Sequence, residues 1–343
     1  SQAVWAQEAA TNDPQLTTND SRFTSAEYDD EARRIIDAAL QNERAFDRLA
    51  YMVDTFGPRF SGTPALENAI DWVLGQMRQD GLENVRGEEV MVPRWVRGEE
   101  SLRMLEPRTE ELAMLGLGGS VGTPVEGVTA DVLVVRSFEE LEKRGADAAG
   151  RIVLFNAPFT SYGETVAYRT DGASRAARHG AVASLIRSVG PASMYTPHTG
   201  MMRYEDGVQE IPHAAITLED AEMLQRMFDR GQRIRLTLKM DARTLPDVPS
   251  RNIIAEIRGT TNPEEVIVLG GHIDSWDVGQ GAMDDGGGCV AAWEAVRLLK
   301  ELNLRPRRTV RVVLWTNEEN GLRGGLAYRD QHEAELDNHV LAI

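Results

Sequence analysis

The stretch EVIVLGGHIDSWDVGQGAMDDGGGCV, residues 265–290, joins an apolar run to a glycine-rich loop that holds one histidine and four aspartates. The run Glu265–Leu269 has the composition of a buried strand, and Gly286–Leu302 has helical spacing. A second apolar run, Thr309–Trp315, follows the helix. Strand, helix and strand in this order predict a βαβ unit with parallel strands, and hence an α/β fold.

Polar side chains with metal-binding chemistry follow each of these elements. His272 and Asp274 come directly after the first strand, Asp284 precedes the helix, and Glu318 and Glu319 come after the second strand. In open α/β sheets, ligands bind beyond the carboxyl ends of the strands. The five side chains are therefore predicted to meet at one rim of the sheet.

The residue types suit a divalent metal, because imidazole nitrogen and carboxylate oxygen are both zinc ligands. Asp274 lies two residues after His272, on the same side of an extended segment, where it can accept the other imidazole N–H. Adjacent side chains diverge, so in the pair Glu318–Glu319 one can bind metal while the other faces a bound water as general base.

Two blander interpretations compete with the metal site. A single His-x-Asp in a loop, or a single Glu-Glu pair, is typical of a solvated surface. The glycines 286–288 resemble a phosphate-binding loop, but the lysine of GxxxxGK[ST] and the spacing of GxGxxG are absent. Together, the three segments favour metal.

Composition limits the partners and the compartment. A formal net charge of −17 over 343 residues disfavours nucleic acid and anionic membranes as partners. The single cysteine, Cys289, excludes an intrachain disulfide and is interpreted as a small core residue. No apolar run approaches the roughly 20 residues of a membrane span. Val4–Ala6 resembles the end of a signal peptide, which predicts an exported protein, secreted or periplasmic.

Changes in composition and in the spacing of apolar residues along the chain predict four segments. Residues 1–26 are a polar leader, and 27–105 begin a first domain with helical spacing over 26–56 and 65–79. Short β-rich runs fill 106–245, and buried-strand runs return in 246–343.

The motifs GGHIDSWDVGQGAMDDGGG and LWTNEENG, with TPHTG at 196–200 and IPHAAIT at 211–217, resemble the di-zinc exopeptidase family of glutamate carboxypeptidase and aminopeptidase type. The resemblance implies a mixed, largely parallel sheet flanked by helices, with a β-rich protease-associated domain inserted at 106–245. It also implies hydrolysis of dipeptides or short peptides, by a carboxypeptidase, dipeptidase or aminopeptidase, and it allows a homodimer.

The resemblance further implies a role for each site residue. Two Zn²⁺ ions are the expected cofactors: His272 binds one, Asp284 bridges both, and Glu319 binds the second. Glu318 is the base that activates the bridging water, and Asp274 orients His272. The Asp284–Asp285 peptide bond is expected to be cis.

In one respect the chain departs from the family pattern. The family has two further ligands, an aspartate past the next strand and a later histidine, and the run Val340–Ile343 stops before either. The 343-residue chain by itself is therefore expected to be weak or inactive. His332, Asp337 and His339 lie too early to match and are predicted to be surface residues. His198 is open to two interpretations, a structural role or contact with substrate.

Two other functions are weighed. A non-catalytic receptor or scaffold of the same fold is expected to have lost ligands, whereas His272, Asp284, Glu318 and Glu319 are all present. In a related amidohydrolase or deacylase group the second domain follows the glutamate pair, whereas here the predicted insert precedes His272.

Overall fold

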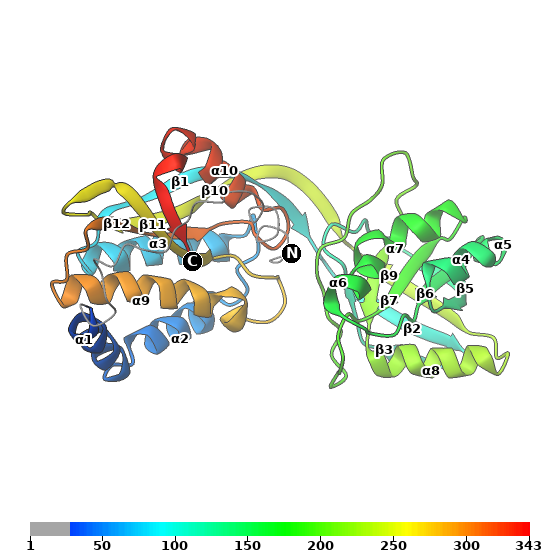
Figure 1. The fold of residues 1–343 in the computed structure, drawn as a ribbon. Helices are drawn as coiled ribbons and strands as arrows, with labels where there is room; N and C mark the ends of the chain where they lie inside the picture. The colour runs from blue at the N-terminus through cyan, green and yellow to red at the C-terminus, as the bar shows by residue number, and fades with distance from the viewer. Residues whose placement is uncertain (1–27) are drawn as a thin grey trace, which may run out of the picture.

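The computed structural model describes residues 28–343 as two units, each built on one β-sheet (Figure 1). The predicted polar leader and the predicted end of a signal peptide lie outside the described residues. The helices of the first unit are α1 (Asp29–Leu40), α2 (Arg44–Phe56), α3 (Pro64–Gln79), α9 (Gly287–Glu301) and α10 (Arg323–Gln331), with a π-helix at Ala282–Gly286 and a 3₁₀ helix at Glu333–Asn338. Among the described residues, none of the helices combines the length and apolar character needed to cross a lipid bilayer.

The first sheet carries the elements named in the predicted βαβ unit. Its strands, in spatial order, are β1 (Glu83–Val96), β10 (Arg243–Ile257), β12 (Arg308–Trp315), β11 (Asn262–His272) and β13 (His339–Ala342). β11 is parallel to both β12 and β13, while β10 is antiparallel to its two neighbours, β1 and β12. α9 connects β11 to β12, so the predicted strand–helix–strand order is present in a mixed sheet.

Helices cover both faces of this sheet. Neighbouring residues of a strand point to opposite faces, and Ile253 and Ile254 accordingly enter different cores. Ile253 packs in the larger core with residues of α2, α3 and α9, including Trp293. Ile254 packs with Val313 and with Tyr328 of α10. In Figure 1 these two helical layers lie below and above the sheet.

The second unit has an eight-stranded sheet with the order β3-β2-β9-β5-β6-β7-β8-β4. Its elements are β2 (Glu100–Glu106), β3 (Glu110–Leu112), β4 (Met114–Gly116), β5 (Val128–Val135), α4 (Phe138–Lys143), α5 (Gly145–Ala148), β6 (Ile152–Phe155), α6 (Tyr162–Thr165), α7 (Ala167–Arg178), β7 (Ala183–Arg187), β8 (His213–Ile216), α8 (Leu218–Asp229) and β9 (Arg235–Met240). Strands β5 to β8 are parallel, and both faces are buried, since Val132 and Leu133 belong to different cores.

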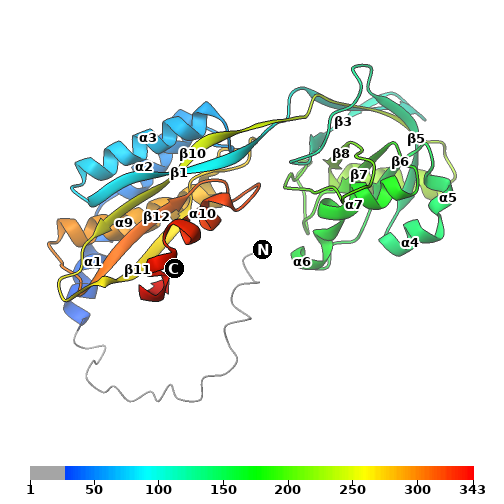
Figure 2. The same cartoon turned by 90° about the horizontal axis from the view of Figure 1, so that it is seen from above.

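Two long strands connect the units. β1 leads out of the first sheet and β10 leads back, and they stay paired to the junction, where Val96 lies opposite Arg243 (Figure 2). The second sheet begins at Glu100 and ends at Met240, close to the predicted insert. The domain boundaries at 106 and 245 stay predictions.

The helical pattern over 26–56 is broken in the structure, which has α1 and α2 separated at Gln41–Glu43. Asn42 explains the break. Its side-chain amide donates to the carbonyl of Ala38, and its Oδ1 accepts from the Arg44 N–H at 3.1 Å. Side chains of this type compete with the backbone for hydrogen bonds and so interrupt helices. Thr63 caps α3 as its sequence suggests, accepting from Leu66 N.

Candidate metal centre

The predicted side chains meet at the carboxyl ends of β11 and β12. His272 is the last residue of β11 and lies opposite Trp315, the last residue of β12. Glu318 and Glu319 follow β12 after a short turn, and Asp284 lies in the π-helical turn that leads into α9. Parallel pairing of the two strands thus brings three segments of the chain to one rim.

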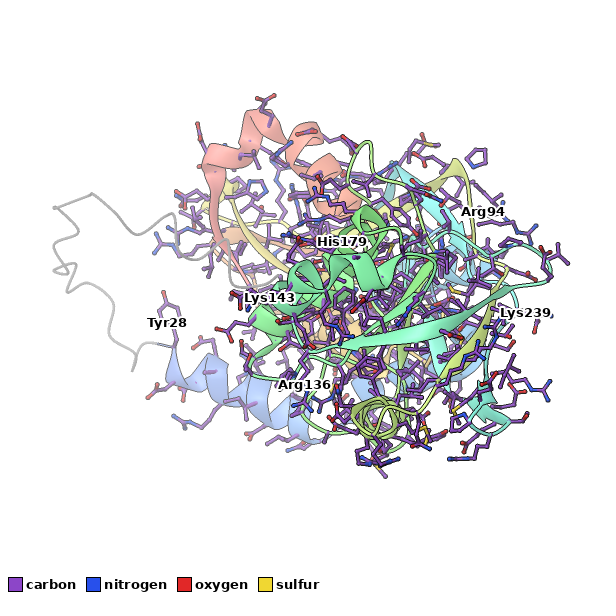
Figure 3. All side chains as sticks on the ribbon, turned by 90° about the vertical axis from the view of Figure 1, so that its right-hand side faces the viewer. Tyr28, Arg94, Arg136, Lys143, His179 and Lys239 are labelled. Atoms are coloured by element: carbon purple, nitrogen blue, oxygen red, sulfur yellow. The ribbon has the colours of Figure 1, made fainter. Side chains whose placement is uncertain are left out.

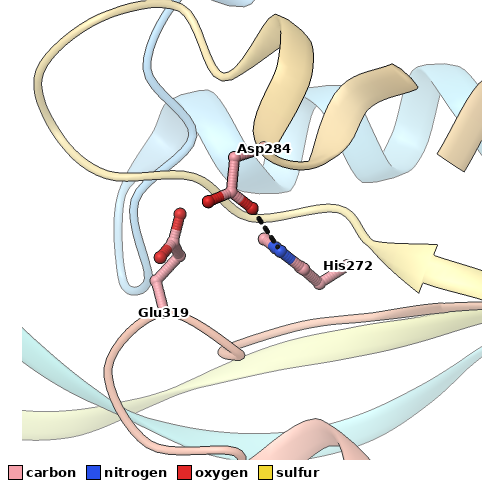
Figure 4. A group of neighbouring side chains, drawn as sticks. All are labelled: His272, Asp284 and Glu319. Atoms are coloured by element: carbon pink, nitrogen blue, oxygen red, sulfur yellow. Dashed lines mark hydrogen bonds and ion pairs between the residues drawn. The ribbon is translucent and has the colours of Figure 1, made fainter. Parts of the chain in front are cut away.

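Three of the five side chains lie within reach of a single ion. One ligand atom each from His272, Asp284 and Glu319 lies within 4.8 Å of the other two. The His272 Nε2 and Asp284 Oδ1 atoms are 3.0 Å apart, and the Glu319 carboxylate points toward Asp284 (Figure 4). The His272 side chain is largely buried, whereas that of Asp284 is 77% exposed. Their roles as metal ligands stay predictions.

Asp274 is fully buried, and its contacts differ from the simplest expectation. The His272 Nδ1 lies 2.9 Å from the main-chain carbonyl oxygen of Asp274 but 3.7 Å from its carboxylate. The carboxylate accepts instead from the N–H groups of Glu318, at 3.0 Å, and Glu319, at 3.2 Å. Asp274 therefore holds the histidine through its backbone and the glutamate turn through its side chain.

Asp285 was not singled out by the sequence argument, yet its carboxylate joins two of the segments. It accepts from the N–H of His272 at 3.0 Å and from the N–H of Gly288 at 3.1 Å. The Asp284–Asp285 peptide bond is cis, as the resemblance implied. A side chain on Gly271 would meet the Asp285 carboxylate, with its Cβ 2.4 Å from Oδ2. An aspartate before a helix start is the signal that was available.

Arg59 is a second residue that the sequence did not indicate. It is fully buried and donates to the carbonyls of Ile273, Gln280 and Gly281 at 2.9 Å each, and to that of Gly57 at 3.1 Å. One guanidinium thus ties together both ends of the loop between β11 and the turn that carries Asp284. Burial lowers the pKa of Arg59. Nothing in the local sequence marks this arginine.

The electrostatics of the cluster suit a cation. Burial by itself lowers the pKa of His272, but Asp274, Glu318 and Glu319 outweigh it and raise that pKa to about 10. Burial and the charge of Asp284 raise the pKa of Glu319 to about 8, and His272 opposes them. Burial also raises the pKa of Glu318. Without metal, the carboxylates of the site therefore favour the protonated forms of His272 and Glu319. The imidazole and carboxylate donors are of the types that bind zinc.

The remaining histidines have separate environments. His213 is buried, with its Nδ1 2.6 Å from the Ser184 hydroxyl, and burial lowers its pKa to about 4. His179 pairs with Glu142 of α4, toward the outer end of the second unit that faces the viewer in Figure 3. His332 is not the surface residue that was predicted. It stacks on Tyr328 with ring centroids 4.2 Å apart and lies 2.9 Å from Glu88.

Comparisons with known proteins agree with this geometry. The model of Peptidase family M28 matches residues 252–343. Carboxypeptidase Q of Mus musculus is 52% identical over 332 residues, which cover 96% of this chain and 71% of the relative. A solved Peptidase M28 precursor from Shewanella amazonensis SB2B has a TM-score of 0.88 and 34% identity, over 93% of this chain and 74% of that one. A zinc aminopeptidase from Bacillus subtilis has a TM-score of 0.66 and 25% identity, over 87% and 67% of the two chains.

These matches confirm the predicted α/β fold of sheets flanked by helices, and they confirm the family on which the sequence argument converged. The chain therefore belongs to peptidase family M28, as a carboxypeptidase Q-like metallo-exopeptidase.

Proposed function

We propose that this protein is a zinc-dependent exopeptidase that hydrolyses dipeptides or short peptides at a centre of two zinc ions. His272 would hold one ion, Glu319 the other, and Asp284 both. The observation that carries the proposal is the convergence of these three side chains, with ligand atoms within 4.8 Å of one another. The zinc aminopeptidase named above, a member of the same structural group, supports the choice of metal.

Zinc bound at these side chains would polarise the substrate carbonyl and make water nucleophilic near neutral pH. The chain itself supplies the proton transfers. Glu318 lies beside the ligands, with its Oε2 3.9 Å from His272 Nε2, and its side chain is 34% exposed. As general base it takes a proton from the attacking water and gives it to the leaving amine. Its raised pKa favours the proton-accepting half of that cycle.

The other side chains position these groups. Asp274, through two main-chain N–H groups, fixes the turn that carries Glu318 and Glu319. Its main-chain carbonyl accepts from His272 Nδ1 and leaves Nε2 free to face a metal. Asp285 and Arg59 hold the loop that ends at Asp284.

The proposal extends to the second unit, which we assign as the protease-associated insert at 106–245. Its eight-stranded sheet, carried on the paired strands β1 and β10, supports this assignment. Export of the protein, to a secreted or periplasmic location, and a homodimer stay predictions.

The test is Glu318→Gln in the zinc-loaded protein, assayed on a set of dipeptides with zinc content measured in parallel. The expected result is loss of hydrolysis by a factor of ~10² to 10⁴, with zinc content unchanged, because the base is removed and the ligands remain. Glu335→Gln, a half-buried glutamate paired with Arg311 away from the site, is the matched control.

Three results would overturn the proposal. Retained activity in Glu318→Gln would show that Glu318 is not the general base. Zinc binding without peptide hydrolysis, in a wild-type chain that also carries the two later ligands of the family pattern, would favour the scaffold function. Hydrolysis of N-acyl amino acids without hydrolysis of peptides would favour the amidohydrolase or deacylase.

A further inference from the structure

The loop between β11 and Asp284 is held by both units. Its two ends are tied to the first unit, because Arg59 donates to the carbonyls of Ile273 and Gly281 at 2.9 Å each. Its middle is tied to the second unit. Trp276, which is partly buried, packs against the core of the second unit that contains residues of β2, β9 and α8. The chain segment that ends at a candidate metal ligand therefore depends on the second unit for part of its packing.

Gly118 is the residue of the second unit that receives the indole of Trp276. A Cβ at Gly118 would lie 2.2 Å from the edge of this ring, so the ring occupies the space of a side chain. The backbone of Gly118 is itself fixed within the second unit. Its N–H donates to the Gly200 carbonyl at 2.9 Å, and its carbonyl accepts from the Met202 N–H at 2.9 Å. Trp276 therefore rests on a part of the second unit that has little freedom to move.

Phe60 is the second aromatic residue at this junction. Its ring is buried and stacks on that of Trp276, with centroids 5.0 Å apart, and it meets Trp95 of β1 edge-on at 6.2 Å. The backbones beneath the two stacked rings are also paired. The Ser275 N–H donates to the Arg59 carbonyl, and the Arg59 N–H donates to the Ser275 hydroxyl, each at 3.0 Å. A displacement of Trp276 would therefore be passed to the segment that carries Phe60.

The segment with Phe60 is linked in turn to the glutamate turn. The hydroxyl of Ser61 accepts from the side-chain amide of Asn317 at 2.9 Å, and both residues are buried. Asn317 immediately precedes Glu318 and has a φ of 59°, in the left-handed region that asparagine tolerates. Through the stack with Phe60, Trp276 is thus connected to both segments of the candidate metal centre, the loop after β11 and the turn after β12.

These connections matter because the ligands have few supports of their own. The Asp284 side chain is 77% exposed, so its place is set mainly by the backbone that carries it. Glu319 lies on a different segment, and the two carboxylates must stay close to share an ion. Residues behind the ligands commonly hold such a geometry, and their loss costs ~10- to 100-fold in metal affinity or activity.

We propose that Trp276, stacked on Phe60, is a positioning residue of the metal centre, through which the second unit sets the place of Asp284 relative to Glu319. This inference rests on the peptidase function proposed above. It gives the second unit a part in assembling the site, apart from any contact of that unit with substrate.

The test compares Trp276→Ala and Trp276→Phe with the wild type, in a chain that also carries the two later ligands of the family pattern. In Trp276→Ala we expect zinc affinity and kcat each to fall ~10- to 100-fold, with KM within ~3-fold, because the ligands are displaced and the substrate contacts remain. Trp276→Phe keeps a ring on Phe60 and should recover both quantities to within ~3-fold of the wild type. The ion pair of Arg97 with Asp277, at 2.7 Å, is kept in each variant, so the loop stays attached to the second unit.

Trp72→Ala is the matched control. It removes a similar stack, on Tyr51 at 4.9 Å, from α3 of the first unit, and it should change neither zinc affinity nor kcat. Equal losses in Trp72→Ala and Trp276→Ala would overturn the inference, because they would reflect general destabilisation. Normal zinc affinity and kcat in Trp276→Ala would overturn it as well.

Gly118→Ala perturbs the same contact from the second unit. The φ of Gly118 lies outside the left-handed region, so alanine is allowed there, but its methyl group would overlap the indole and push Trp276 away. Zinc affinity should therefore fall in this variant too. In the double variant Gly118→Ala/Trp276→Ala the methyl group enters the space that the indole leaves, so the loss should not exceed that of Trp276→Ala alone. Additive losses would overturn the inference. If Trp276→Ala does not fold, Gly118→Ala decides, and normal zinc affinity in it would overturn the inference.

Amide hydrogen exchange of the metal-free protein separates this inference from the peptidase function. The N–H groups of His272, Glu318 and Glu319 are bonded to aspartates of the loop. Their exchange should become at least ~10-fold faster in Trp276→Ala and stay unchanged in Trp72→Ala. Faster exchange in a protein that hydrolyses no peptide would support the positioning role while the peptidase function fails. Unchanged exchange of all three groups in Trp276→Ala would overturn the positioning role whatever the peptide assay shows.

Discussion

Replacing Asp274 by Asn removes one negative charge from the most buried carboxylate of the metal centre and leaves its shape almost unchanged. Burial lowers the pKa of His272, and Asp274 is the strongest of the neighbours that raise it from 6.5 to about 10. At about 1.4 kcal/mol for each pKa unit, the net rise corresponds to ~5 kcal/mol of favourable interaction with the protonated imidazole. Asp274 accounts for much of this interaction.

In the metal-free Asp274→Asn variant we therefore expect the pKa of His272 to fall well below 10, because burial remains when the strongest opposing charge is lost, while Glu318 and Glu319 still raise the pKa. One of the two N–H groups of Glu318 and Glu319 also faces an amide NH₂ in place of an oxygen, which costs ~1–3 kcal/mol. The sign of the pH dependence follows. A raised folded-state pKa gives stability that is full below pH 6.5 and is lost as the pH rises through about 10, and this dependence should be weaker in the variant.

The measurement is an NMR titration of the metal-free protein with labelled histidine, in which His272→Gln identifies the signal among six histidines. The matched control is Asp277→Asn, on the same loop but paired with Arg97, which should leave the titration of His272 unchanged. A His272 pKa that stays near 10 in Asp274→Asn would refute the electrostatic account of this site.

Three further outcomes are expected. Zinc binding at pH 7 should release about two protons, because the pKa values of about 10 for His272 and about 8 for Glu319 keep both groups protonated without metal. Calorimetry in buffers of different ionisation enthalpy measures this release, and a heat independent of the buffer would contradict it. The pKa of His213 is about 4, below its usual 6.5, so its contribution to stability is full above pH 6.5 and falls by ~3 kcal/mol toward pH 4. Urea unfolding at pH 7 and pH 4.5 should show a smaller loss in His213→Gln, and equal losses would argue against this source. Arg59→Met should lower the free energy of unfolding by ~3 kcal/mol and weaken zinc binding, because four carbonyls lose a donor. Arg187→Met, which removes one bond of 3.3 Å, should cost under ~1 kcal/mol, and similar losses in the two variants would contradict the proposed role of Arg59.

The sequence was most informative where the physical signal is local. The apolar run before His272 and the run before Glu318 each have the composition of a buried strand, and the rule that ligands lie beyond parallel strands then brings their ends together. The structure pairs these strands in parallel, with His272 opposite Trp315. Thr63 before Pro64 was a local signal of the same kind for the start of α3.

What the sequence missed depends on contacts between distant segments. The backbone N–H of Arg59 meets the Ser275 hydroxyl across 216 residues, and no periodicity encodes such a contact. The carboxylate of Asp274 was expected to face His272, but it binds the turn 44 residues later, because the imidazole is already satisfied by the main-chain carbonyl. His198 could be placed in a loop, but which surface that loop faces is set by the packing of Gly118 on Trp276.

The central claim is that His272, Asp284 and Glu319 hold zinc, and anomalous diffraction at the zinc edge from zinc-soaked crystals tests it most directly. The account predicts two peaks ~3.5–4 Å apart, with the His272 Nε2 and the carboxylate oxygens of Asp284 and Glu319 at ~2.0–2.2 Å from the ions. Zinc peaks held by other side chains, with none beside these three, would contradict it.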